Sequence, residues 1–230
     1  MSAIFEIVAG LLLGYALASI IESMMHEYVA DASPAIVAAW RRHPRLFRKL
    51  INTHLGHHVV HHHQTYLTTH VRQFETPCHR RRVTGLLLRR GRYGRIIVAS
   101  DFGLRLLPDG IFFYLLPSVP PAVVLCIAVP VTVALPAMVA LTLPALFSHA
   151  VHPFLHMPFA QAQAVAPPLM AIFLRTAYGR ALFRNHFLHH HFGGVSNFNL
   201  LLGADGLRRR YRRADACALR TMRDVGMPVD

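Results

Sequence analysis

The sequence predicts an all-α protein, in which a bundle of about three to four transmembrane helices carries a helical cap on its cytoplasmic side. Two long apolar stretches, residues 2–25 and 111–148, predict the membrane helices. The basic residues are confined to other blocks of the chain, and most of the 17 histidines gather in short clusters beside the apolar stretches. We interpret residues 1–230 as one domain.

The first apolar stretch contains two charged side chains, Glu6 and Glu22, and is long enough for one crossing. Residues 111–148 contain no charged residue and no histidine, and their 38 residues have room for two short crossings. If all the histidine clusters form one site, the chain must cross the membrane an even number of times between His58 and His152. A hairpin that breaks near Pro130 satisfies this condition.

The basic residues indicate the orientation of the chain. All 24 Lys and Arg residues lie in 41–105 and 175–223, although the net charge is +13. This block pattern is typical of cytoplasmic loops near anionic lipid. We therefore expect a multi-pass membrane protein whose histidine-rich segments, 26–100 and 149–213, lie on the cytoplasmic side. No module that reads nucleic acid is present, so no nucleic-acid partner is expected.

The histidine spacing predicts metal ligands. Two triplets share the spacing H-x(2)-H-H, which places three imidazoles within one sector of a helix, and a further pair is separated by four residues. These residues are His54, His57 and His58, then His186, His189 and His190, then His152 and His156. Eight or more imidazoles are too many for one ion, so two metal ions are expected. Nitrogen ligands suit iron, zinc, copper and nickel alike.

The first histidine-rich segment also matches the triplet motif in a second register. His58-Val-Val-His61-His62 also satisfies H-x(2)-H-H, and we favour the register that starts at His54. We then expect the remaining histidines of these clusters to lie either beside the metal ligands or on the solvated surface. They are His61, His62, His63, His149 and His191.

Over residues 20–207, this order of motifs resembles the fatty acid hydroxylase/sterol desaturase superfamily of integral-membrane di-iron oxygenases. The first motif of that family is E-x(3)-H-x(4)-H, and here it is formed by Glu22, His26 and Asp31. Asp31 stands where the family has its second histidine, and a carboxylate can also ligate iron. The segment Asn197-Phe198, followed by Asp205, is similar to the family's N-[FY]…D ending.

The resemblance implies two Fe ions, which Zn can replace in isolated protein, with O₂ as co-substrate. It implies hydroxylation of an unactivated C–H bond in a fatty acyl or other lipid chain, with no catalytic residue beyond the metal ligands. The implied ligands are His26, Asp31, His54, His57, His58, His152, His156, His186, His189 and His190. A desaturase on the same site, a non-catalytic membrane metal-binding protein and a zinc-loaded structural protein remain as alternatives.

The resemblance also implies a separate electron donor of the cytochrome b5 or ferredoxin type. The sequence contains no haem, flavin or iron–sulfur motif of its own. The basic residues within 80–95 and 208–213 are candidates to dock an acidic donor, and attraction to lipid headgroups explains them equally well.

Overall fold

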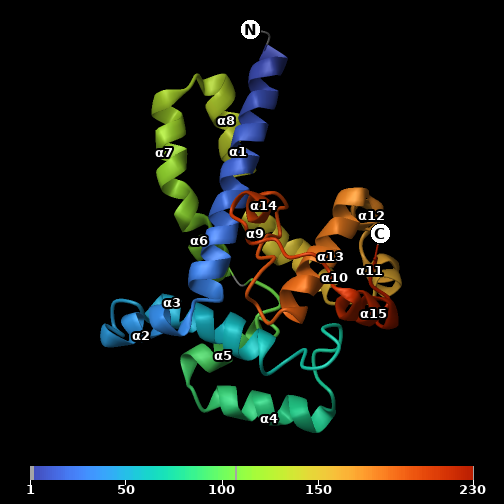
Figure 1. Cartoon of the computed structure of the whole chain (residues 1–230). Helices are drawn as coiled ribbons and strands as arrows, with labels where there is room; N and C mark the ends of the chain where they lie inside the picture. The colour runs from blue at the N-terminus through green and yellow to red at the C-terminus, as the bar shows by residue number, and fades with distance from the viewer. Residues whose placement is uncertain (1–2, 107, 230) are drawn as a thin grey trace.

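The computed structural model describes residues 3–106 and 108–229, and every regular element within these ranges is helical (Figure 1). The elements are α1 (Ala3–Met25), η1 (His26–Ala30), α2 (Pro34–Arg42), α3 (Arg48–His54), η2 (Leu55–His62), α4 (Pro77–Leu88), α5 (Arg92–Ala99), α6 (Pro108–Leu115), η3 (Leu116–Ser118), α7 (Val119–Ala128), α8 (Val131–Ala140), α9 (Leu143–Leu146), η4 (Phe147–Val151), α10 (His152–Leu155), α11 (Phe159–Val165), α12 (Pro168–Arg175), α13 (Ala177–His191), α14 (Ala204–Leu207) and α15 (Ala216–Asp224). The all-α prediction is therefore confirmed for the described residues.

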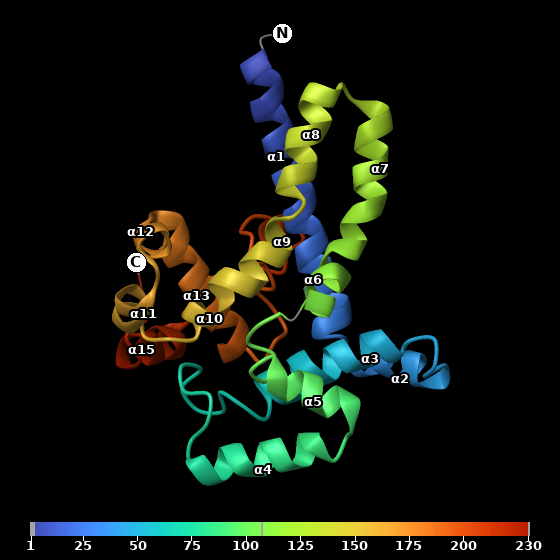
Figure 2. The ribbon, with the colours of Figure 1, turned by 180° about the vertical axis from the view of Figure 1, so that it is seen from behind.

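In the part of the chain that the structure describes, two helical spans are long and apolar enough to cross a membrane: Ala3–Ala30, with 28 residues, and Val131–Leu155, with 25. A shorter apolar helix, Leu116–Ala128, precedes the second span. Figures 1 and 2 show α7 and α8 as an antiparallel hairpin beside α1. The hairpin turns at Val129 and Pro130, close to the predicted break, because Val129 adopts an extended conformation and the Pro130 ring has no N–H to continue α7.

The backbones of α1 and α8 approach closely. Gly10 and Gly14 lie on one face of α1, and a Cβ atom added to either would lie 2.3 Å from the carbonyl oxygen of Val133 or Ala137, respectively. Ala18 continues this stripe and is fully buried. Small residues four apart allow helices to pack backbone to backbone, which is the main way apolar helices associate in lipid. The stripe therefore fixes α1 against α8.

Three π-helical segments interrupt the α-helical chain at its histidine-rich points. They are η1, η2 and η4. A π-helix closes i→i+5 hydrogen bonds and so has a wider turn than an α-helix, and such segments are frequent at functional sites. Here the wider turn changes which histidines share a face.

A second helical layer lies below the apolar hairpin. The helices α10–α13 and α15 enclose a core that includes Phe183, Phe187 and Met222. Helices α4 and α5 pack against η2 through Val60, Val83 and Phe102. Residues 164–184 do not form one continuous helix. Instead α12 ends at Arg175 and α13 begins at Ala177, because Thr176 is extended and its hydroxyl caps the N–H of Gly179.

Candidate metal centres

The histidines converge in two adjacent groups near the end of the apolar hairpin. Each group contains at least four side chains whose ligand atoms lie within 4.8 Å of one another. Group 1 consists of His26, Asp31, His57, His62 and His189; group 2 consists of His61, His152, His156 and His186. Both groups draw ligands from η2 and α13, so these two helices connect the centres.

In group 1, four Nε2 atoms surround one carboxylate. The Nε2 atom of His57 lies 2.9 Å from that of His26 and 3.1 Å from that of His62. The Nε2 atom of His189 lies 3.2 Å from that of His62. The Oδ2 atom of Asp31 lies 3.2–3.4 Å from the Nε2 atoms of His189, His26 and His57. Asp31 therefore belongs to the centre of the group.

Group 2 contains four imidazoles and no carboxylate. The Nε2 atom of His156 lies 2.8 Å from that of His186, 3.1 Å from that of His61 and 3.3 Å from that of His152. All four side chains are buried. The rings of His152, His156 and His186 meet edge to face, which lets their nitrogens converge without stacking.

Backbone carbonyls fix the orientation of several rings. The Nδ1 atoms of His152, His156 and His189 lie 2.8–3.2 Å from the carbonyl oxygens of Leu104, His70 and Ser196, respectively. A carbonyl oxygen can only accept, so each Nδ1 must carry the proton and each Nε2 presents a lone pair to its group. Metal-ligating histidines are held in this way.

This arrangement fits metal ions. Lone pairs that face one another at about 3 Å repel unless a cation lies between them. Two ligands bound to one ion at 2.0–2.1 Å are separated by about 2.9–3.4 Å at octahedral to tetrahedral angles. The observed separations of 2.8–3.3 Å between nitrogens match this range. Both groups could therefore hold a metal ion.

The electrostatic environment keeps four of the ligands in their binding forms. Burial, together with the neighbouring imidazoles, holds the pKa values of His61, His156 and His186 well below the ordinary range of histidine. Burial acts to raise the pKa of Asp31, but the surrounding imidazoles outweigh it and hold that pKa well below the ordinary value of a carboxyl group. Neutral imidazole and ionised carboxylate are the forms that bind metal.

Seven of the ten predicted ligands lie in the two groups, and three do not. The Nδ1 atom of His54 lies 3.2 Å from the carbonyl oxygen of Ala30. The Nδ1 atom of His58 lies 2.8 Å from Oδ1 of Asp31, so His58 supports that carboxylate from outside the group. The ring of His190 stacks on His62, with centroids 4.0 Å apart, and its buried Nε2 atom has no hydrogen-bond partner among the described residues.

Two ligands of the groups, His61 and His62, were not among the predicted ligands. The prediction assumed α-helical offsets of zero, three and four, which select His54, His57 and His58. In the π-helix η2, residues four or five apart share a face instead, and these are His57, His61 and His62. The competing register contained two of these three residues, so the signal was present in the sequence.

A buried polar network contacts His26 on the side of its Nδ1 atom, whereas its Nε2 atom faces group 1. Oε1 of Glu22 lies 3.5 Å from Nδ1 of His26, while Oε2 accepts hydrogen bonds from the Asn199 side chain and the Leu200 N–H. Asp205 accepts hydrogen bonds from Ser23 and from the Asn199 N–H. These contacts tie the 197–206 segment to α1. Asp205, singled out in the sequence, thus helps to position the site. Asn197 pairs instead with Asn185 and Arg212, and neither residue enters either group.

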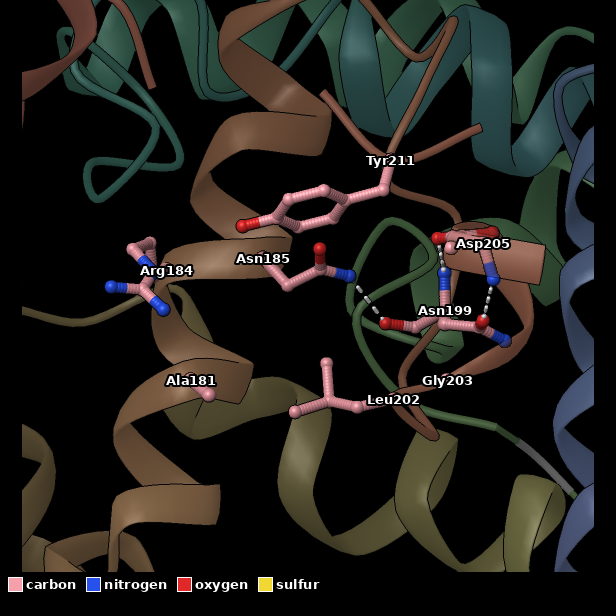
Figure 3. Close-up of a pocket in the computed structure, with 9 residues that line it drawn as sticks. Ala181, Arg184, Asn185, Asn199, Leu202, Gly203, Asp205 and Tyr211 are labelled. Atoms are coloured by element: carbon pink, nitrogen blue, oxygen red, sulfur yellow. Dashed lines mark hydrogen bonds between the residues drawn. The ribbon is translucent and has the colours of Figure 1, made fainter. Parts of the chain in front are cut away.

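Part of this network lines a pocket of about 230 Å³ between α13 and the segment 199–211. Figure 3 shows Asn185 directed toward Asn199, which is paired in turn with Asp205. The hydrogen-bonding atoms of these three side chains are used within the network. The pocket therefore borders the hydrogen-bond network that supports His26, and it is separate from the two histidine groups.

Comparison of the chain with protein-family models, with curated proteins and with solved structures finds no match. The function of the chain is therefore inferred from the site itself.

Proposed function

We propose that this protein is an integral-membrane di-iron hydroxylase that uses O₂ to oxidise an unactivated C–H bond of a fatty acyl or other lipid chain. One observation carries the proposal: nine side chains from separate parts of the chain converge in two adjacent, metal-compatible groups beside an apolar hairpin. The resemblance of the motif order to the hydroxylase/desaturase superfamily supports the same assignment.

The donor set suits iron. Imidazole nitrogen and carboxylate oxygen bind Fe(II), and four or five protein ligands leave positions on an ion that takes six. Two iron ions, when bound, would supply the activation of O₂ that oxidation of such a bond requires. The chain's own contribution is to hold His152, His156 and His189 in the tautomer that binds metal, and to bury the ligands away from bulk water.

The proposal places α1 and the α7–α8 hairpin in the bilayer, with the histidine groups at its cytoplasmic surface. The apolar side chains that face outward on α1 and on the hairpin favour this arrangement; Ile4, Ile127 and Val131 are 75%, 82% and 74% exposed. A lipid chain could then reach the site from the bilayer without crossing water. The sequence expectation of three to four crossings remains a prediction.

A separate electron donor would be required, and α4 provides a suitable docking surface. Its arginines Arg80, Arg81 and Arg82 are exposed and form no ion pair among the described residues. Figures 1 and 2 show α4 at the end of the molecule opposite the hairpin, which favours a soluble acidic donor over lipid headgroups. Replacing the three arginines with glutamine should slow donor-supported turnover and leave metal content unchanged; unchanged turnover would contradict this docking surface.

The test is metal analysis followed by product analysis. The full chain is purified, loaded anaerobically with Fe(II) and exposed to O₂ with a reductant and a lipid extract. We expect about two irons per chain and, by mass spectrometry, products that have gained one oxygen atom. Products that have lost two hydrogens would show a desaturase instead, and bound metal without any product would favour a metal-binding protein.

Matched variants connect the activity to the site. His57→Ala and His189→Ala should abolish product formation, because each removes a ligand of group 1. His63→Ala is the control, since this neighbouring histidine is exposed and lies in neither group. Near-wild-type activity in both ligand variants would contradict the proposed function.

A further inference from the structure

An open groove lies at the junction of α2 and α3, apart from both histidine groups. It has a volume of about 590 Å³ and is lined by Pro44, Arg45, Arg48, Ile51 and Asn52. Figures 1 and 2 show α2 and α3 projecting beside the C-terminal end of α1. The groove therefore lies beside the end of the first apolar span.

The groove is strongly cationic, and nothing in the described structure neutralises it. Residues 41–49 contain five Lys or Arg side chains, and residues 32–74 contain no Asp or Glu. Arg45 and Arg48 form no ion pair among the described residues. The guanidinium of Arg48 lies 5.8 Å from the ring centroid of Tyr93, and this contact restrains the side chain.

A third polar group at the groove has an unused donor. The Nδ2 atom of Asn52 is buried and has no hydrogen-bond partner within residues 3–106 and 108–229. Asn52 follows Arg48 by four residues on α3, so the two side chains share one face of the helix. A buried N–H group is normally paired, so this donor can serve an acceptor that a ligand supplies.

We propose that this groove binds a phosphate group. Two guanidinium groups and an amide donor form a set that recognises a tetrahedral oxyanion, because guanidinium pairs with phosphate oxygens through parallel charge-assisted hydrogen bonds. The position at the end of α1 favours the phosphate of a lipid headgroup over free phosphate. The binding itself does not depend on the metal centres.

The groove also bears on the substrate of the proposed function. Asn52 precedes His57 by five residues, which is an axial rise of about 7–8 Å along a helix. A lipid held by its phosphate would thus be tethered close to group 1, and phosphate-headed lipids would be the substrate class. This last step rests on the proposed function, and the choice of a lipid headgroup rests on its placement of α1 in the bilayer.

The experiment measures binding to the full chain in a phosphate-free detergent by calorimetry. Three probes are used: inorganic phosphate, dihexanoyl phosphatidic acid, and dihexanoyl glycerol, which has the same chains without phosphate. The variant Arg45→Gln/Arg48→Gln is compared with Arg41→Gln/Arg42→Gln, which removes the same charge from the neighbouring helix α2. Asn52→Asp places a negative charge at the groove without changing side-chain size.

We expect phosphatidic acid to bind, and the groove pair and Asn52→Asp each to weaken its binding by about tenfold or more. The α2 pair should change it less than about twofold, because Arg41 and Arg42 lie outside the groove. Inorganic phosphate that binds as tightly as phosphatidic acid would identify a free anion as the ligand. Equal losses in the two arginine pairs, or equal binding of dihexanoyl glycerol, would overturn the proposal.

Binding and activity are measured separately, so their failures can be distinguished. Phosphatidic acid that binds to a protein without oxygenase activity would support the groove and remove only its link to the substrate. Circular dichroism and metal content check that each variant is folded. A groove variant that binds phosphatidic acid like the wild type while folded would end the assignment.

Discussion

Oδ2 of Asp31 lies 3.2 Å from Nε2 of His189, so a carboxylate that follows η1 meets an imidazole from α13 inside one group of ligands. Asp31 also accepts a hydrogen bond from His58, and the carboxylate is fully shielded from solvent. This contact joins the two halves of the chain. It also makes Asp31, which stands where the motif that the sequence resembles has a histidine, a testable part of the site.

Asp31→Ala should weaken metal binding at group 1 by about 10- to 100-fold, because it removes an anionic ligand and leaves His58 without its partner. Asp31→His should retain more of the affinity, because it restores the ligand type of the family motif. Equilibrium dialysis against Fe(II) or Zn(II) measures both. Equal affinity in wild type and Asp31→Ala would remove Asp31 from the site.

Consecutive histidines should affect different ions. His61 belongs to group 2 and His62 to group 1, whereas His63 is exposed and belongs to neither. His61→Ala and His62→Ala should therefore each reduce the metal content from about two ions per chain to about one. His63→Ala should keep both ions. Elemental analysis of the three purified variants gives the answer, and a loss in His63→Ala similar to the other two would contradict the two-group assignment.

Acid should destabilise the metal-free protein. Burial holds the pKa values of His61, His156 and His186 well below 6.5, whereas the unfolded chain takes up these protons near pH 6.5. The unfolded state thus binds more protons as pH falls through 6.5. Each of these histidines lowers the free energy of unfolding by up to about 1.4 kcal/mol per pH unit.

Asp31 does not contribute to this acid effect above pH 5. Its pKa is lowered in the folded protein, so the stability that it adds is lost only when the pH falls below the ordinary titration range of a carboxyl group. Thermal denaturation of metal-free protein between pH 7.5 and pH 5.5 should show a falling midpoint. A midpoint that stays constant over this range would show that the three imidazoles are not buried in neutral form.

The glycine stripe of α1 should be intolerant of larger residues. In Gly14→Val, the new Cβ would lie 2.3 Å from the Ala137 carbonyl oxygen, so α1 and α8 would have to separate. We expect a destabilisation of about 1–3 kcal/mol, the usual cost of overpacking. Gly85→Ala is the control, because no atom lies within 4 Å of its added Cβ and alanine favours a helix. Equal melting temperatures for wild type and Gly14→Val would contradict the close packing.

Composition and periodicity predict the helical fold and the place where the apolar hairpin turns, since Pro130 has no N–H group to continue the helix that precedes it. They also predict that Asp31, His57 and His189 belong together. They do not predict the orientation of η2, because local histidine spacing does not distinguish a π-helical turn from an α-helical one. That wider turn places His61 and His62 in the site and leaves His54 outside it.

The hydrogen bonds from Nδ1 of His152, His156 and His189 end on main-chain oxygens of Leu104, His70 and Ser196. Every amino acid supplies that oxygen, so substitutions at these three acceptor positions leave the chemical partner in place as long as the backbone keeps its path. The side chains at those positions can therefore change during evolution without altering the orientation of the imidazoles. Selection must preserve only the backbone path of the loops there.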